Sequence, residues 1–164
     1  TLGPSPTRFR SKLALMHPDA TITATDTHPA RRQALRSATE RLSNVTVIDP
    51  GQAANQTYDR ILLDVPCSNT GVLARRPEAR YRFSQQTLGE LVKLQREIID
   101  NAKAWLAPKG LILYSTCSIE PPENHNQIKK LLRNDAELLQ EHQQFPTADT
   151  DAYTEASYHA LVRF

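Results

Sequence analysis

The sequence is poor in glycine and cysteine, and it contains no long apolar run. Its 164 residues include 5 glycines and 2 cysteines, against 11 prolines. None of its apolar stretches reaches the roughly 20 residues that a membrane-spanning helix needs, so we expect no membrane partner. A signal peptide with a basic start and a small-residue cleavage site is also absent. Two cysteines without such a signal are typical of a reducing compartment, and we expect a cytoplasmic protein with free thiols.

The charges nearly balance, with 20 basic and 18 acidic side chains and a net charge of +2. Overall charge alone therefore does not require a nucleic-acid partner. The distribution is uneven, because Tyr81 and Phe83 are interleaved with four clustered arginines, namely Arg75, Arg76, Arg80 and Arg82. Arginines beside aromatic rings suit RNA phosphates and unstacked bases, so we expect RNA contact here, with a solvated surface as the alternative. The 5 histidines lack metal-ligand spacing, and we expect no metal site.

Apolar runs and amphipathic segments alternate along the chain. Short apolar runs predict strands, namely 21–25, 44–48, 58–64, 111–117, 157–164 and a short one over 137–139. Apolar residues that recur every three to four positions predict helices, namely 7–16, 29–42, 84–106 and 123–133. The remaining segments are expected to be loops or turns, namely 52–57, 66–83 and 108–110. Strands that alternate with helices indicate an α/β fold with a mostly parallel sheet.

The two ends of this predicted sheet differ from a simple parallel arrangement. The last two predicted strands could pair as an antiparallel hairpin at the C-terminal edge. At the other end, Thr1 to Pro4 already reads as the turn that would follow a first strand, so we expect that strand to be missing. A chain of 164 residues fits one domain, residues 1–164, and can bury a core.

Both cysteines directly follow predicted strands. Cys67 lies in the segment from Asp64 to Ser68, and Cys117 lies between Thr116 and Ser118. The carboxyl ends of adjacent parallel strands are where ligands bind in such sheets, so two thiols there indicate covalent chemistry. Taken singly, each cysteine could instead be a small buried hydrophobic residue, and Asp64 could be a turn or cap residue.

The segments around the cysteines resemble the paired cysteine motifs of RNA cytosine-C5 methyltransferases. Residues 64–72 and 75–78 are similar to the first motif, and residues 94–95, 108–110 and 114–124 to the second. The similarity covers nearly the whole chain, and it is to bacterial small-subunit ribosomal RNA enzymes of the Sun/Fmu type. The resemblance implies a Rossmann-like methyltransferase fold, S-adenosylmethionine as cofactor, and ribosomal RNA as the substrate in which 5-methylcytosine is made.

The resemblance also implies a role for each cysteine. C5 of cytosine is a poor nucleophile, so a thiolate first adds to C6 and creates an enamine that attacks a methyl group through C5. In this family the attacking thiolate would be Cys117, and Cys67 would assist release of the product. Asp64 would hold the cytosine edge and favour protonation of N3. Glu120 and Glu123 are expected to stabilise the start of the following helix rather than act as an acid/base pair.

Cofactor-binding residues are implied at three further positions. Asp26, at the end of the second strand of the family's fold, would bind the ribose, and Asp49 would lie near the adenine. Each could instead form an Asx turn after its strand. Pro6 matches the proline of the family's cofactor loop, and Asp64 is counted with these cofactor-binding residues as well.

The chain departs from the family at that cofactor loop. The family's pattern is Cys-Ala-Ala-Pro-Gly-Gly-Lys-Thr, and counting back from Asp26 aligns residues 3–10, where only Pro6 coincides. Both glycines are replaced, so side chains would stand where the cofactor approaches the backbone. Asn69 also occupies a position where a small residue is usual.

Three explanations of this departure stay open. The chain could be a divergent methyltransferase that holds its cofactor differently. It could be a catalytically inactive homologue that acts as an RNA- or protein-binding subunit. It could also be a fragment whose first strand is supplied by another chain or domain. A DNA cytosine methyltransferase is disfavoured, because a Thr-Cys pair also follows the later strand.

Overall fold

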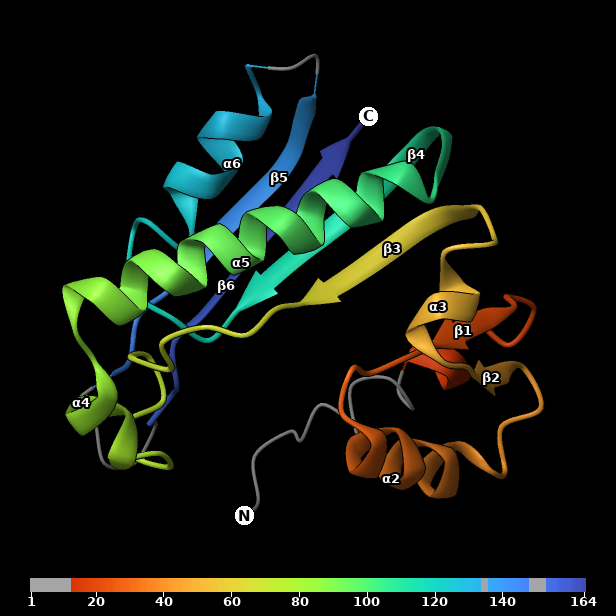
Figure 1. The fold of residues 1–164 in the computed structure, drawn as a ribbon, viewed down its shortest axis with the longest axis horizontal. Coiled ribbons are helices and arrows are strands. Elements are labelled where there is room, and N and C mark those ends of the chain that lie inside the picture. Colours follow the sequence, from red (N-terminus) through yellow and green to blue (C-terminus); the bar gives the residue numbers. More distant parts are fainter. Residues whose placement is uncertain (1–12, 134–135, 148–152) are drawn as a thin grey trace. The chain divides into compact units, whose positions relative to one another are not determined.

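The computed structural model describes residues 13–133, 136–147 and 153–164 (Figure 1). The chain forms two compact units, the first ending at Gln56 and the second beginning at Thr57. Pro6 and the cofactor loop lie outside the described residues, and so does the expected absence of a first strand. The expectation of a single domain over residues 1–164 stays a prediction.

The first unit contains two short parallel strands, β1 (Ile22–Ala24) and β2 (Val45–Val47), with Ile22 opposite Val45. Helix α2 (Pro29–Thr39) connects them and begins with proline, whose fixed φ suits a first helical position. Its Leu35 is buried. Both predicted strands are confirmed, whereas the helix ends at residue 39 instead of 42. Residues 13–16 are helical, and the rest of the helix predicted over 7–16 lies outside the described residues.

The second unit is built on a four-stranded sheet with the order β3-β4-β6-β5. Its strands are β3 (Tyr58–Asp64), β4 (Leu106–Thr116), β5 (Glu137–Gln144) and β6 (Ser157–Arg163). β3 and β4 are parallel, whereas β6 is antiparallel to both β4 and β5. The predicted α/β class, with parallel strands and an antiparallel C-terminal edge, is therefore confirmed.

Helices of the second unit cover one face of this sheet. They are α5 (Gln85–Ala104) and α6 (His125–Leu131), whereas the short helix α4 (Glu78–Arg82) lies beyond the carboxyl ends of β3 and β4 (Figure 1). Figure 1 shows α5 and α6 over the same face, and Ile99 of α5 and Ile128 of α6 join Tyr114 and Tyr158 in the core. Ser84 caps α5 as predicted, because its side chain accepts a hydrogen bond from the Thr87 backbone.

The structure corrects four loop, turn or strand predictions. Helix α4 lies inside the segment predicted as a loop over 66–83, and α3 (Pro50–Ala53) begins before the loop predicted over 52–57. The turn expected over 108–110 is an irregular part of β4, with Lys109 at φ 63°. β5 runs for 8 residues rather than three. β5 is polar because it lies at the edge of the sheet. It is held by backbone hydrogen bonds to β6, so its sequence lacks the apolar pattern from which a strand is predicted.

Of the helices in the described part of the chain, none combines the length and apolar character that crossing a bilayer requires.

Candidate active site

Neighbouring parallel strands bring the two cysteines together. Asp64 at the end of β3 pairs with Ser115 of β4, and the Val65 N–H donates to the Ser115 carbonyl at 3.2 Å. Because β3 and β4 are parallel, the loops that follow them begin at the same end of the sheet. The sulfur atoms of Cys67 and Cys117 in these loops lie 3.2 Å apart. Both are free thiols, with Cys67 buried and Cys117 partly exposed. The sequence-based prediction that both sulfurs share one site agrees with this geometry.

The contact between the sulfurs makes the two thiols unequal. The hydrogen bond with Cys117 raises the pKa of Cys67, and burial raises it further. The same hydrogen bond lowers the pKa of Cys117; the Arg76 charge also lowers it, while burial and the Asp64 charge oppose the shift. Cys67 therefore holds its proton more firmly, and Cys117 is the thiol that ionises more easily. A thiolate is the nucleophilic form of cysteine.

Glycine 71 allows the two cysteine loops to approach closely. Its N–H donates to the Cys117 carbonyl at 3.1 Å, and its carbonyl accepts from the Ala156 N–H at 2.9 Å. A Cβ atom at this position would lie 2.7 Å from the Cys117 oxygen and 2.3 Å from the Ala156 Cβ. The close approach of backbone to backbone therefore requires glycine.

A buried carboxylate fixes the loop that carries Cys67. Glu123 is fully buried, and its Oε1 accepts hydrogen bonds from the Ser68 N–H and from Gln95 Nε2, both at 2.9 Å. Gln95 of α5 also donates to the Pro66 carbonyl at 2.9 Å. The structure thus gives Glu123 a role at the active-site loop that the sequence-based interpretation missed. The sequence held one sign of this contact, because the polar Gln95 lies inside the apolar stripe of a predicted helix and would need a buried polar partner.

Hydroxyl groups connect the Cys67 loop to the Cys117 loop. The Ser68 and Ser118 hydroxyl oxygens lie 3.0 Å apart, and Thr70 Oγ1 lies 3.3 Å from the same Ser118 oxygen. Asn124 stabilises the Cys117 loop, because its Nδ2 donates to the Ser118 carbonyl at 2.8 Å. Its Oδ1 accepts from the Thr116 hydroxyl at 2.7 Å. The cysteines are therefore supported by a continuous polar network, as a site with fixed geometry requires.

A pocket of about 420 Å³ opens beside Cys67. Residues 67–69 line it, together with Arg76 before α4 and residues of α4, α5 and the turn between these helices, including Arg82, Phe83 and Leu91. Asp64 is exposed at the end of β3, and its charge acts on Cys117. The pocket therefore combines a thiol, positive charge and apolar surface.

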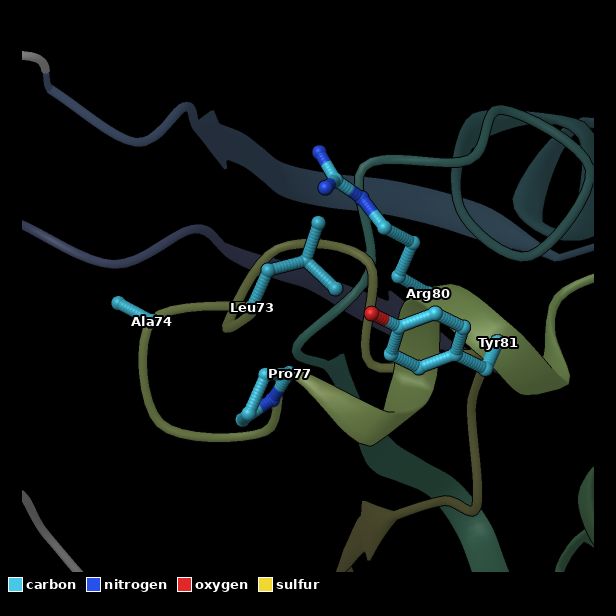
Figure 2. Close-up of a pocket in the computed structure, with 5 residues that line it drawn as sticks. All are labelled: Leu73, Ala74, Pro77, Arg80 and Tyr81. Carbon is cyan, nitrogen blue, oxygen red and sulfur yellow. The ribbon is translucent and has the colours of Figure 1, made fainter.

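A second pocket, of about 300 Å³, lies at the turn before α4 and on α4 itself. Figure 2 shows the residues that line it, which are Leu73, Ala74, Pro77, Arg80 and Tyr81. The Tyr81 side chain is 86% exposed, which is unusual for a large aromatic ring. The predicted arginine cluster is thus divided: Arg76 and Arg82 line the first pocket, Arg80 lines the second, and Arg75 pairs with Glu155.

The first unit places one carboxylate after each of its two parallel strands. Asp26 Oδ1 accepts from the His28 N–H at 2.8 Å, which is the Asx turn considered from the sequence, and from Arg31 Nε at 3.0 Å. Asp49 caps α3 and forms an ion pair with Arg32 at 2.7 Å. Arg32 also donates to the Asp26 carbonyl at 2.7 Å, so it links the ends of β1 and β2.

Comparisons with known proteins agree with this architecture. Residues 7–161 match the profile of the family 16S rRNA methyltransferase RsmB/F. The chain is 38% identical over 129 residues to the ribosomal RNA small subunit methyltransferase B of Shewanella oneidensis, covering 74% of this chain and 30% of that protein. The corresponding protein of Photorhabdus laumondii is 36% identical over 130 residues, with coverage of 74% and 30%.

Solved structures show the same fold. A methyltransferase homologue from Pyrococcus horikoshii superposes with a TM-score of 0.71 and 28% identity, covering 94% of this chain and 57% of that one. NSun6 from the same organism, solved with SFG, has a TM-score of 0.78 and 22% identity, with coverage of 99% and 46%. The chain spans about 30% of the length of the curated relatives named above. The match over residues 7–161 and the identity to these relatives show that the chain belongs to the 16S rRNA methyltransferase RsmB/F family.

Proposed function

We propose that this chain belongs to a methyltransferase that makes 5-methylcytosine in ribosomal RNA through a covalent bond between Cys117 and C6 of the base. The observation that carries the proposal is the contact between two free thiols of unequal acidity at the ends of adjacent parallel strands. Membership of the family and the names of the curated relatives support ribosomal RNA as the substrate.

The chemistry assigns the two thiols different roles. The Cys117 thiolate adds to C6, and the electron pair of the C5–C6 double bond moves into the ring to give an enamine. Asp64 holds the base edge and favours protonation of N3 during this addition. After C5 has gained a methyl group, a water molecule acting as base takes the C5 proton, the C5–C6 double bond reforms, N3 returns its proton to Asp64 and Cys117 departs as a thiolate. Cys67 assists this last step, and its raised pKa keeps it protonated until then.

S-adenosylmethionine, when bound, supplies the electrophilic methyl group. Asp26 and Asp49 fit its ribose and adenine ends, because carboxylates after adjacent parallel strands are the acidic groups that bind ribose hydroxyls in such sheets. Their own contacts with Arg31 and Arg32 fix the carboxylates in place. Pro6 and Asp64 complete the proposed cofactor-binding residues.

The arginine cluster is the proposed RNA-binding surface. Arg76, Arg80 and Arg82 border two pockets that are both lined in part by α4, which also carries the exposed Tyr81 ring. Guanidinium groups suit phosphates, and an exposed ring suits an unstacked base.

We further propose that the reaction takes place in the cytoplasm, and that another domain or chain completes the sheet.

Trapping of the covalent intermediate tests the proposal. Cys67→Ala should accumulate a denaturant-stable adduct with a small-subunit ribosomal RNA transcript in the presence of S-adenosylmethionine, because release is blocked. The double variant Cys67→Ala/Cys117→Ala is the matched control and should form none. An adduct in the double variant would contradict the role of Cys117. Absence of any adduct, together with no cofactor binding by calorimetry, would favour the inactive RNA- or protein-binding homologue.

A further inference from the structure

Asn69 lies between the two cysteines in a backbone conformation that few residues adopt. Its φ is 60°, in the left-handed region, which glycine and asparagine tolerate better than other residues. Its Nδ2 donates to the Cys67 carbonyl at 2.8 Å. Its Oδ1 lies 3.2 Å from Cys117 Sγ and accepts the thiol hydrogen bond. One amide group therefore contacts both cysteine residues.

These two contacts fix which end of the amide faces Cys117. The Cys67 carbonyl can only accept a hydrogen bond, so the NH₂ group must point toward it and the amide oxygen must point toward Cys117. An oxygen acceptor stabilises the protonated sulfur, whereas it repels a thiolate at the same distance. Cys67 acts in the opposite sense, because its hydrogen bond with Cys117 lowers the pKa of Cys117 and so favours the thiolate. Asn69 and Cys67 thus compete over the protonation state of one sulfur.

We propose that Asn69 is a positioning residue that restrains Cys117, because its amide oxygen holds the thiol form and fixes the sulfur beside Cys67. The inference concerns the reactivity of the thiol in the free protein, so it stands independently of the proposed function. The charged groups that act on Cys117 are the Asp64 carboxylate and the Arg76 guanidinium, and substitution of Asn69 removes neither.

Asn69→Gly is the cleanest test, because glycine adopts φ 60° without strain and only the side chain is lost. Alkylation of Cys117 by iodoacetamide is followed against pH, with mass spectrometry separating it from alkylation of Cys67. The pKa of Cys117 should fall by about 0.5–1 unit, the value of one lost hydrogen bond. Below that pKa, alkylation should be about three to ten times faster than in the wild type.

Asn69→Asp provides the opposite change at the same site. Aspartate also tolerates the left-handed conformation, keeps an acceptor oxygen near the sulfur and adds a negative charge, so the pKa of Cys117 should rise. An unchanged pH profile in Asn69→Gly, with an unchanged urea midpoint, would mean that Asn69 only shapes the turn and would overturn the inference. A raised pKa in that variant would overturn it as well. Neither result depends on RNA or cofactor, so failure of the proposed methyl transfer would be recognised separately in the adduct assay.

Discussion

Two thiols whose sulfur atoms are 3.2 Å apart cannot both ionise easily, because the second thiolate would face the first. The proton that remains is held between them, and the lowered pKa of Cys117 arises mainly from the hydrogen bond that Cys67 donates. Cys67 therefore does more than fill space beside the nucleophile. It lowers the pKa of Cys117, the proposed nucleophile, and this effect can be measured without any substrate.

Replacing Cys67 with alanine should raise the pKa of Cys117, because the donor that stabilises its thiolate is lost. Alkylation of Cys117 at about pH 7 should slow by about threefold or more, the effect of one hydrogen bond. Cys67→Ser is the matched control, since its hydroxyl can still donate, and it should keep most of the lowered pKa. The measurement is the pH dependence of iodoacetamide alkylation at Cys117. Faster alkylation in Cys67→Ala would contradict this account.

The residues that support the cysteines were harder to predict than the cysteines themselves. The strand patterns alone predicted that Cys67 and Cys117 lie close together, because adjacent parallel strands have their carboxyl ends on the same side of the sheet. Asn69 and Glu123 left no periodic signal, and Gln95 only interrupted an apolar stripe without naming its partner, because a buried polar side chain is defined by its partner rather than by its spacing. Their contacts could be seen only once the loops were placed in space.

At the scale of elements, the turn through Gly71 joins the loop after β3 to the loop after β4. We expect Gly71→Ala to destabilise the second unit by about 1–3 kcal/mol, because its Cβ would overlap the Cys117 carbonyl and Ala156. Gly89→Ala is the matched control, since this exposed position in α5 has no neighbouring atom within 4 Å. It should stabilise the protein by about 0.5–1 kcal/mol through helix propensity. Urea unfolding measures both, and equal midpoints for the two variants would refute the expectation.

Elements with apolar faces were predictable, and polar elements were not. β3 and β4 contain apolar runs, and α5 has apolar residues at helical spacing, so their positions followed from pattern. The 5-residue helix α4 is mostly charged, and β5 is a polar edge strand. Both are held by neighbours rather than by their own apolar faces, which is why sequence periodicity missed α4 and shortened β5.

We expect the pairing of β5 with β6 to make this edge sensitive to acid, because it places two histidines opposite each other. His142 lies opposite His159, with ring centroids 5.2 Å apart, and burial together with the His142 charge lowers the pKa of His159. A histidine whose pKa is lower in the folded protein binds more protons when unfolded, so its stabilising contribution is present above about pH 6.5 and is lost as the pH falls. His159→Gln should therefore reduce the loss of stability between about pH 7.5 and about pH 5.5.

Urea midpoints at these two pH values test the effect of His159. His142→Gln is informative as the second variant, because it removes the opposing charge and should raise the pKa of His159 toward its ordinary value. It should thus also weaken the pH dependence, but less than His159→Gln does. A pH dependence identical in all three proteins would show that the histidine pair does not govern this edge.

At the scale of the whole molecule, a net charge of +2 gives little general attraction for RNA, so any attraction must come from local clusters. Arg75 and Arg76 have acidic partners, Glu155 and Glu78. Within the described part of the chain, no ion pair engages Arg80 or Arg82. These two arginines are therefore the ones whose charge is most available to phosphates.

The double variant Arg80→Ala/Arg82→Ala should weaken binding of a single-stranded ribosomal RNA fragment, and the slope of log affinity against log salt should flatten by about 0.7 for each lost phosphate contact. Arg163→Ala is the matched control, since it removes an exposed arginine paired with Glu137 on the β5–β6 edge and should leave RNA affinity unchanged. Tyr81→Ala should weaken binding without changing the salt slope, because base stacking releases no counterions. Fluorescence anisotropy across a salt series measures all three. An equal loss of affinity in Arg163→Ala would mean that RNA is attracted by overall charge and not by the surface around α4.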